Sequence, residues 1–273
     1  MSENIVPKLV IEALGAFALC FFSIGAVILT QGQDIVAIGL ATGLAIGIMV
    51  AAGGHISGGH FNPAITLGVL AAKRISVPDA VGYIIAQMIG AVLGAGALTL
   101  MYLDVDRNRV NLGMPAVGTS LVADPPVDLS VWNALAMETV LTFFLVLVVF
   151  GTAVDKRSIG RWVAPWAIGI TIAIGNMAGV AVSGAAMNPI RWFGPAVIQR
   201  DWTNGWVWIV GPIVGGIVAA VLFDMFLMDK SAPVPAPDPS ASTRVRSVDV
   251  DEIDVIEMQN APASPRRRTR RKR

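Results

Sequence analysis

Charged residues are scarce in this sequence. Only 14% of its 273 residues are Asp, Glu, Lys or Arg, and 55% are apolar. Soluble domains carry nearly twice that charged fraction. The mean hydropathy of +0.67 has the sign expected of a chain that lies largely in lipid. The composition therefore excludes an ordinary soluble domain and indicates a membrane protein.

Cysteine and histidine are also scarce, which limits the chemistry available to the chain. The one cysteine, Cys20, lies inside an apolar run, so an intrachain disulfide framework and a thiolate metal site are excluded. The two histidines, His55 and His60, flank a Gly-rich segment at a spacing that is not a metal signature. A net charge of +1 argues against binding to nucleic acid. We expect no metal and no cofactor.

The charges that are present divide the chain into two regions. Residues 1–228 hold ten basic and twelve acidic side chains, and the shorter segment 229–273 holds ten and seven. This segment passes from a Pro/Ala/Ser stretch through an acidic patch to a basic end, a composition typical of disorder. We expect a membrane domain over 1–228 and a disordered tail over 229–273. The basic end of the tail is either solvated or bound to anionic lipid.

Several apolar runs are long enough to cross a bilayer, which requires about 20 residues per helix. The sequence predicts six membrane spans, at residues 8–29, 35–53, 79–101, 132–154, 162–182 and 206–228. The first run is too long for the apolar core of a signal peptide and is not followed by a small-residue cleavage site. We interpret it as an uncleaved first span.

The basic residues predict the orientation of these spans, because Lys and Arg near span ends are retained in the cytoplasm. With the N-terminus inside, sixteen basic residues fall on the cytoplasmic side. Only Arg107, Arg109 and Arg200 fall outside. We expect both termini to be cytoplasmic and the protein to lie in the plasma membrane.

An internal repeat relates the two halves of the membrane domain. A shift of 126 residues superposes Glu12 on Glu138, Gly43 on Gly169, and Asn62-Pro63 on Asn188-Pro189. The repeats, about 8–101 and 132–228, each hold three predicted spans. Because three is an odd number, the second copy enters the membrane from the opposite side, as inverted repeats of membrane proteins do.

Two shorter apolar stretches, 62–71 and 188–198, follow polar segments rich in small residues. Ten helical residues cover about 15 Å, half the hydrocarbon thickness. We expect them to be re-entrant half-helices that meet near the midplane. Irregular backbone at that depth must line protein or a water-filled cavity, so the pattern predicts a pore.

The start of each half-helix carries the same dipeptide. Pro63 and Pro189 fit the first helical position, where the missing N–H has no intrahelical partner, and Asn62 and Asn188 are candidate N-caps. The two N-termini would face each other, each with roughly half a positive charge. This arrangement predicts a barrier to cations and protons, while the asparagine amides remain able to donate hydrogen bonds to a neutral solute.

These motifs resemble those of the aquaporin (major intrinsic protein) family, over residues 8–228. The first half carries the run from Gly54 to Gly68, with Asn62-Pro63-Ala64 at its centre, and the second the run from Ser183 to Ala196, with Asn188-Pro189-Ile190. Ile190 departs from the family, which usually has alanine there. We expect this change to alter packing at the midplane and to leave conduction intact.

The resemblance also implies which residues form the constriction of the pore. By their spacing from the two motifs these are Thr42, Asn176, Ala185 and Arg191. Arg191 would repel cations and donate hydrogen bonds to solutes, while the other three are smaller than in water-selective members and none is aromatic. Since pore diameter and lining decide what passes, we expect permeability beyond water. Thr42 also lies in a stripe with Gly39, Gly43 and Gly47, which would bring two helices together.

The same resemblance implies that Glu12 and Glu138 support the loops that lead into the half-helices by accepting hydrogen bonds from backbone amides. A proton relay through these buried carboxylates is the alternative. His55 and His60 are assigned to hydrogen bonding of the first loop, with pH gating as the alternative.

Together these observations predict an all-α membrane protein, with six transmembrane helices and two re-entrant half-helices from an inverted repeat, and not an enzyme. The resemblance implies a homotetramer that conducts water and small neutral solutes passively and excludes protons and ions. The segment 153–160 resembles the nodulin-26-like branch and its bacterial relatives, which leaves a glycerol, urea or metalloid-acid facilitator as an alternative. A secondary transporter shares inverted repeats but would usually carry more coupling carboxylates.

Overall fold

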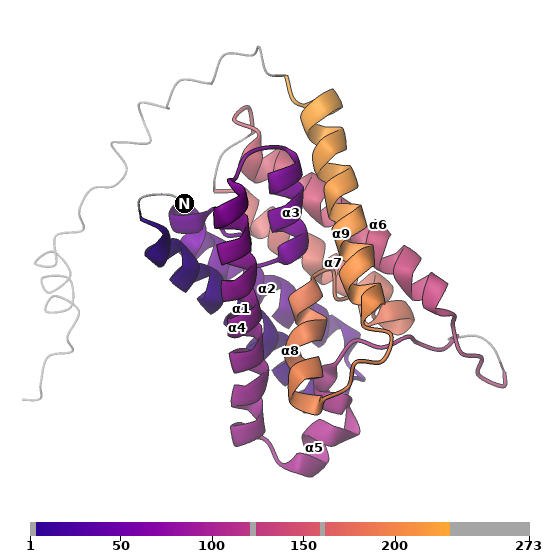
Figure 1. Cartoon of the computed structure of the whole chain (residues 1–273). Helices are drawn as coiled ribbons and strands as arrows, with labels where there is room; N and C mark the ends of the chain where they lie inside the picture. Colours follow the sequence, from indigo (N-terminus) through magenta and orange to yellow (C-terminus); the bar gives the residue numbers. More distant parts are fainter. Residues whose placement is uncertain (1–3, 121–123, 159–161, 230–273) are drawn as a thin grey trace, which may run out of the picture. The chain divides into compact units, whose positions relative to one another are not determined.

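The computed structural model describes residues 4–120, 124–158 and 162–229 (Figure 1). The tail expected from residue 229 onward lies, except for its first residue, outside the described residues. The described chain is almost entirely helical. Its elements are α1 (Ile5–Thr30), α2 (Ile35–Ser57), α3 (Pro63–Ala71), α4 (Val77–Met101), α5 (Asp104–Arg109), η1 (Asn111–Gly113), α6 (Val131–Val149), η2 (Phe150–Val154), α7 (Ala164–Ser183), α8 (Pro189–Gln199), α9 (Trp206–Leu222) and η3 (Phe223–Leu227).

Six of these segments are long and apolar enough to cross a membrane, namely α1, α2, α4, α6 with η2, α7 and α9 with η3. Their bounds confirm the six predicted spans to within a few residues. The largest difference is at the end of α2, where residues 54–57 continue the helix beyond its predicted end at residue 53. Gly53 is buried against the side chain of Ile11, so this glycine serves close helix packing instead of ending the helix.

The spanning helices pack in pairs that the repeat relates to one another. In the first half α1 packs against α4, in the second half α6 packs against α9, and α2 joins the halves by packing against α7. Where α2 crosses α7, a Cβ atom on Gly43 would collide with the carbonyl oxygen of Gly169. A Cβ atom on Gly39 would lie 2.9 Å from the carbonyl oxygen of Ala173. The glycine stripe next to Thr42 therefore lets two backbones approach closely.

The short helices α3 and α8 confirm the two predicted half-helices. Each begins with proline after an asparagine N-cap. Helix α3 packs against α9, where a side chain on Gly68 would lie 3.1 Å from the carbonyl oxygen of Gly216. Helix α8 packs against α4, where a Cβ atom on Gly194 would lie 2.7 Å from the carbonyl oxygen of Ala91. Each half-helix is thus held by the third spanning helix of the opposite repeat.

The connection between the repeats contains two short helices that the sequence did not predict, α5 and η1. Helix α5 follows the end of α4 (Figure 1). Leu112 in η1 is fully buried and has a left-handed backbone with φ of 48°. A side chain on the next residue, Gly113, would lie 3.2 Å from Cβ of Val27 on α1. The connection is therefore pressed onto α1, which gives the Gly113 carbonyl a fixed position.

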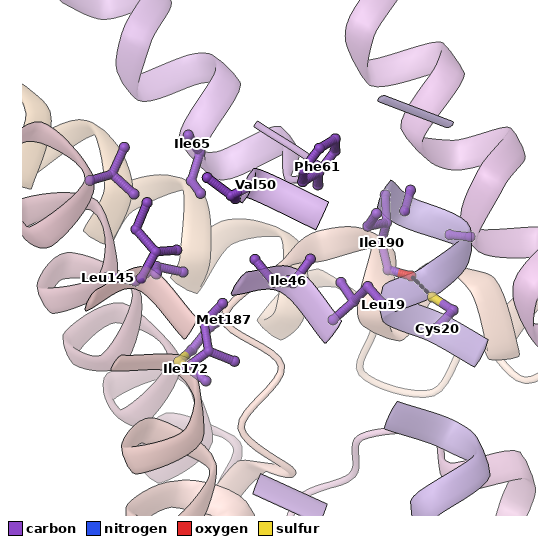
Figure 2. Close-up of a cluster of buried hydrophobic side chains, with 14 of the residues drawn as sticks. Leu19, Cys20, Ile46, Val50, Phe61, Ile65, Leu145, Ile172, Met187 and Ile190 are labelled. Carbon is purple, nitrogen blue, oxygen red and sulfur yellow. Dashed lines mark hydrogen bonds between the residues drawn. The ribbon is translucent and has the colours of Figure 1, made fainter. Parts of the chain in front are cut away.

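A continuous apolar core surrounds the junction of the two half-helices (Figure 2). It combines side chains of both repeats, including Phe61 and Met187 from the two loops and Ile190 from α8. The core therefore holds the two repeats together at the site where the loops meet.

Candidate functional site

The loops that lead into α3 and α8 follow the same backbone path. Three positions in each loop have positive φ angles, at Gly58, Gly59 and Phe61 in the first and at Gly184, Ala185 and Met187 in the second. These positions are related by the same shift of 126 residues. Left-handed φ angles are unfavourable for residues with a side chain, so Phe61 and Met187 need other contacts to hold them in place.

The carboxylate of Glu12 supplies those contacts in the first loop. It accepts hydrogen bonds from the backbone N–H of His60 at 2.9 Å and from that of Phe61 at 2.6 Å. The hydroxyl of Ser57 and the side-chain amide of Gln87 also donate to it, at 2.6 and 2.7 Å. Glu12 on α1 therefore fixes the loop from Ser57 to Phe61.

Glu138 on α6 occupies the related position in the second half. Its carboxylate accepts from the backbone N–H of Ala186 at 2.9 Å, from that of Met187 at 2.7 Å, and from the hydroxyl of Ser183 at 2.7 Å. Both glutamates are completely buried. A buried charge is costly unless it is hydrogen-bonded, and each of these carboxylates is bonded to the loop that it holds.

Asn62 and Asn188 bind each other's loops across the junction. The side-chain oxygen of each asparagine accepts from the N–H two residues later, at 2.8 Å in α3 and 3.2 Å in α8. The Nδ2 of Asn62 donates to the carbonyl oxygen of Met187, and that of Asn188 donates to the carbonyl oxygen of Phe61, both at 2.9 Å. An amide nitrogen carries two hydrogens, so each asparagine keeps one N–H beyond this reciprocal pair. The two half-helices therefore meet through their N-termini.

Ile190, where the first half has Ala64, lies in the apolar core with 1% of its surface exposed. Its carbonyl oxygen accepts a weak hydrogen bond from the thiol of Cys20 at 3.6 Å (Figure 2). The backbone of Ile190 thus contacts α1, while its larger side chain is part of the apolar core.

Arg191 lies in the first turn of α8, in the same buried region, with 4% of its surface exposed. Its Nε donates to the hydroxyl of Ser23 on α1 at 2.5 Å, and its Nη1 donates to the carbonyl oxygen of Gly113 at 2.8 Å. Both acceptors are neutral, and among the described residues no carboxylate lies within salt-bridge distance. No described carboxylate therefore pairs with the guanidinium, which lies close to the N-terminus of α8.

The other three residues assigned to the constriction are buried in the same membrane body. Thr42 on α2 donates to the carbonyl oxygen of Ile38 at 2.7 Å, and Asn176 on α7 donates to that of Ile172 at 3.1 Å. Ala185 lies in the second loop and has the left-handed φ of 45°. Within the described chain, no hydrogen bond joins any two of the four constriction residues. Their common lining of one passage stays a prediction.

His55 lies elsewhere than its assignment to loop support implied. It is exposed in the last turn of α2, and within the residues that the structure describes its side chain makes no hydrogen bond. His60 is the histidine that lies in the loop. Its Nδ1 is 3.1 Å from the hydroxyl of Thr66, and its ring packs edge-on against Tyr83. Helix α2 extends four residues further than expected, to Ser57, so His55 belongs to the helix and not to the loop.

Some residues of the site were missed by reasoning from the sequence. The Tyr83 hydroxyl and the Trp208 indole N–H each donate at 2.8 Å to a loop carbonyl, that of Ser57 and that of Ser183. Gln87 is a polar residue inside a predicted span, which could have marked it as a partner of Glu12. No pattern in the sequence pairs Ser23 with Arg191.

The described residues contain no group of three or more His, Cys, Asp or Glu that could hold a metal ion. The polar groups at the junction are amides, hydroxyls, one guanidinium and the two carboxylates that hold the loops. Such groups exchange hydrogen bonds with neutral solutes. The serine hydroxyls nearest to a carboxylate, those of Ser57 and Ser183, donate to the buried carboxylates of Glu12 and Glu138, and the same carboxylates hold the loop backbone.

Comparison with known proteins agrees with this geometry. Residues 1–223 match the Major intrinsic protein family. The chain belongs to this family. Among curated relatives, aquaporin-4 of Mus musculus is 41% identical over 192 residues, which are 70% of this chain and 56% of that protein. Aquaporin NIP1-1 of Zea mays is 34% identical over 229 residues, 82% of this chain and 76% of that protein.

A solved structure supports the assignment of the fold. The aquaglyceroporin from Plasmodium falciparum superposes with a TM-score of 0.70 at 24% sequence identity, over 82% of this chain and 97% of that one. The matched part of this chain spans between 56% and 65% of the length of the aquaporin-4 relatives. The family and the six apolar helices make this an integral, multi-pass membrane protein.

Proposed function

We propose that the chain is a passive channel for water and small uncharged solutes. The observation that carries this proposal is the reciprocal pair formed by Asn62 and Asn188, which joins two half-helices by their N-termini. Each asparagine retains one N–H that a passing oxygen can accept, so a neutral solute can exchange its water contacts for protein contacts.

The electrostatics of the junction support the exclusion of protons and cations. Two helix N-termini each contribute roughly half a positive charge, and Arg191 adds a full charge that no described carboxylate pairs with. Since a cation would lose its hydration without finding an anionic partner, it meets a barrier that a neutral molecule does not.

We further propose that Thr42, Asn176, Ala185 and Arg191 form a wide polar constriction that admits solutes larger than water. Three of the four have small or medium side chains and none is aromatic. Their burial in the membrane body supports this assignment. A facilitator of glycerol, urea or metalloid acids with water as a secondary substrate is the second candidate, since matched proteins include an aquaglyceroporin structure and a NIP1-1 channel.

The surroundings of the channel complete the proposal. Both termini lie in the cytoplasm, as the asymmetry of the basic residues favours, and the protein resides in the plasma membrane. The subunit forms a homotetramer with one pore per subunit. The basic end of the tail binds anionic lipid of the cytoplasmic leaflet.

Stopped-flow light scattering on proteoliposomes tests the constriction. Wild type should pass water, glycerol and urea, whereas the double variant Thr42→Phe, Asn176→His should pass mainly water because two bulky rings narrow the passage. The matched control is Leu40→Phe, which places the same ring on an exposed face of α2 and should behave as wild type.

The outcomes of this experiment separate two errors. A wild type that passes water alone would refute the wide constriction and leave the channel standing. Uptake of glycerol that depends on an imposed proton or sodium gradient would refute the passive channel in favour of a secondary transporter.

A further inference from the structure

An apolar groove runs along the outer face of α1 beside α4, away from the junction of the half-helices. It has a volume of about 480 Å³ and is lined by Phe21, Phe22, Gly25, Leu98 and Met101, among others. The lining from residue 21 to residue 29 extends for about 12 Å along α1. The groove therefore begins within the hydrocarbon region and follows the helix toward its C-terminal end.

A second pocket, of about 310 Å³, continues this groove at the end of α1. The two share Leu29 and Tyr102 in their linings, and the second adds Gln31, Asp106 and Arg109. Leu103 and Val105 of the neighbouring segment are about 70% exposed. Apolar residues exposed beside charged ones are typical of the boundary between hydrocarbon and headgroups. The apolar groove thus ends in a polar pocket at headgroup depth.

The polar pocket carries one charge of each sign. Within the part of the chain that the structure describes, the guanidinium of Arg109 and the carboxylate of Asp106 form no salt bridge. The hydroxyl of Tyr102 also has no partner there, and neither does the side-chain oxygen of Gln31. The pocket therefore offers donors for an anion and acceptors for a cation, side by side.

We propose that the groove and pocket together bind one phospholipid with an ethanolamine headgroup. An acyl chain lies along the groove over Gly25, the phosphate binds Arg109 and Tyr102, and the ammonium donates hydrogen bonds to Asp106. Both charges of the headgroup then find an opposite charge.

The charge pattern selects this lipid against the other common phospholipids. A choline headgroup has no N–H to donate to the carboxylate of Asp106. A glycerol headgroup leaves the lipid with a net negative charge, which the same carboxylate repels. Ethanolamine is the headgroup that satisfies both Arg109 and Asp106.

Native mass spectrometry of the full chain in detergent tests the proposal, with phosphatidylethanolamine, phosphatidylcholine and phosphatidylglycerol of identical acyl chains as probes. Arg109→Gln should weaken binding of the ethanolamine lipid about tenfold, because a charge-assisted hydrogen bond to phosphate is lost. Arg200→Gln is the matched control, since it removes an exposed arginine that does not line the pocket, and it should bind as wild type.

Two further variants separate the headgroup from the acyl chain. Asp106→Asn should abolish the preference for ethanolamine over choline and increase binding of the glycerol lipid. Gly25→Leu should weaken all three lipids by filling the groove, and it is compatible with folding because a Cβ there would meet its nearest neighbour, Leu98, at 3.7 Å. Gly96→Leu, where that distance is 3.6 Å to Ile198, is the control outside the groove.

Three results would overturn the proposal. The first is equal binding of the three lipids to wild type, and the second is unchanged selectivity in Asp106→Asn. The third is a shift in oligomeric state of Gly25→Leu without a change in lipid binding, since this would assign the groove to a second copy of the chain. Solute transport does not enter the test, so its outcome is independent of the proposed channel function.

Discussion

The two loops that carry the half-helices have the same backbone path but different polar surroundings. In the first half, Glu12 is accompanied by Gln87, Thr66 and His60, which bond to the glutamate or to one another. The positions related to these three by the repeat are Ile213, Trp192 and Ala186. The carboxylate of the first loop therefore belongs to an extended side-chain network, whereas that of the second loop has Ser183 as its one side-chain partner among the described residues.

The residue that follows the half-helix motif also differs between the halves. The second half has Arg191, bonded to Ser23 and Gly113, where the first half has Ile65. The repeat thus supplies a symmetric junction, and its departures from symmetry place one positive charge on one side of that junction. The shared residues build the junction, and under the proposed function the residues that differ set its selectivity.

Among the polar substitutions, the largest effect is expected from Glu138→Gln. The side-chain N–H₂ of a glutamine would face backbone N–H groups that need an acceptor. Ile213, which corresponds to Gln87 of the first half, cannot accept a hydrogen bond from that N–H₂. We expect the free energy of unfolding to fall by about 3 kcal/mol, since hydrogen bonds to a charged group are worth about 1.5–3 kcal/mol each. Thermal unfolding of the purified channel, followed by tryptophan fluorescence, measures this loss.

The matched variant in the first half is Glu12→Gln. Its new N–H can donate to the side-chain oxygen of Gln87, which has no partner in the described chain. We expect a smaller loss, of about 1 kcal/mol. Equal losses in the two halves would show that the polar network around Glu12 does not buffer the change.

Ile190→Ala makes the second motif identical to the first and tests the apolar side of the comparison. Removal of a buried isoleucine side chain leaves a cavity, and we expect a loss of about 2–4 kcal/mol in stability. Water permeability per folded channel should stay unchanged, because the Ile190 side chain belongs to the apolar core and is 1% exposed. A severalfold change in permeability at unchanged stability would place Ile190 in the passage instead.

Ser23→Ala tests the asymmetry at Arg191. The guanidinium would keep its bond to the Gly113 carbonyl and lose the one to the hydroxyl. A net hydrogen bond of about 1 kcal/mol corresponds to about a fivefold effect. We expect the ratio of glycerol to water permeability to change by about that factor and Ser23→Thr to restore it. An unchanged ratio in Ser23→Ala would mean that Gly113 alone positions Arg191.

The smallest effect concerns the end of the first helix in each half. In the second half, Asp155 accepts hydrogen bonds from Arg157, and these bonds lower the pKa of Asp155 below its ordinary value of 3.8. The related position in the first half is Leu29. Because the pKa of Asp155 is lower in the folded state, the ion pair stabilises the fold at pH values above the ordinary pKa. This stabilisation is lost as the pH falls through the lowered pKa of the folded state.

We therefore expect wild type and Asp155→Asn to differ in Tm by about 1 °C between pH 5 and pH 7, because the pair is exposed. The difference should shrink below about pH 4. Thermal scans over this pH range in one detergent measure it. A constant difference down to pH 3 would exclude the ion pair as its source.

Much of the fold could be predicted from the sequence because its signals are long or repeated. Six apolar runs fixed the spans, and the two Asn-Pro motifs fixed the half-helices through their capping chemistry. The extension of α2 to Ser57 could not be predicted, because the sequence alone does not distinguish a glycine that ends a helix from a glycine that lets two helices pack closely. This extension places His55 on the helix and outside the loop.

The site was predictable where the repeat doubled the signal. Glu12 and Glu138 each accept hydrogen bonds from the loop of their own half. The bond between Arg191 and Ser23 joins residues 168 positions apart and has no counterpart in the other half, so neither spacing nor symmetry could indicate it. The contact of Arg191 with the Gly113 carbonyl could not be predicted either, because Gly113 lies in the connection between the repeats, where the sequence has no hydrophobic periodicity.

The most direct test of the account is the osmotic water permeability of proteoliposomes with a pH gradient across the membrane. We predict that permeability rises in proportion to the amount of protein, is the same with and without the gradient, and leaves the gradient intact. Permeability equal to that of empty vesicles, or rapid loss of the gradient through the protein, would contradict a passive channel that excludes protons.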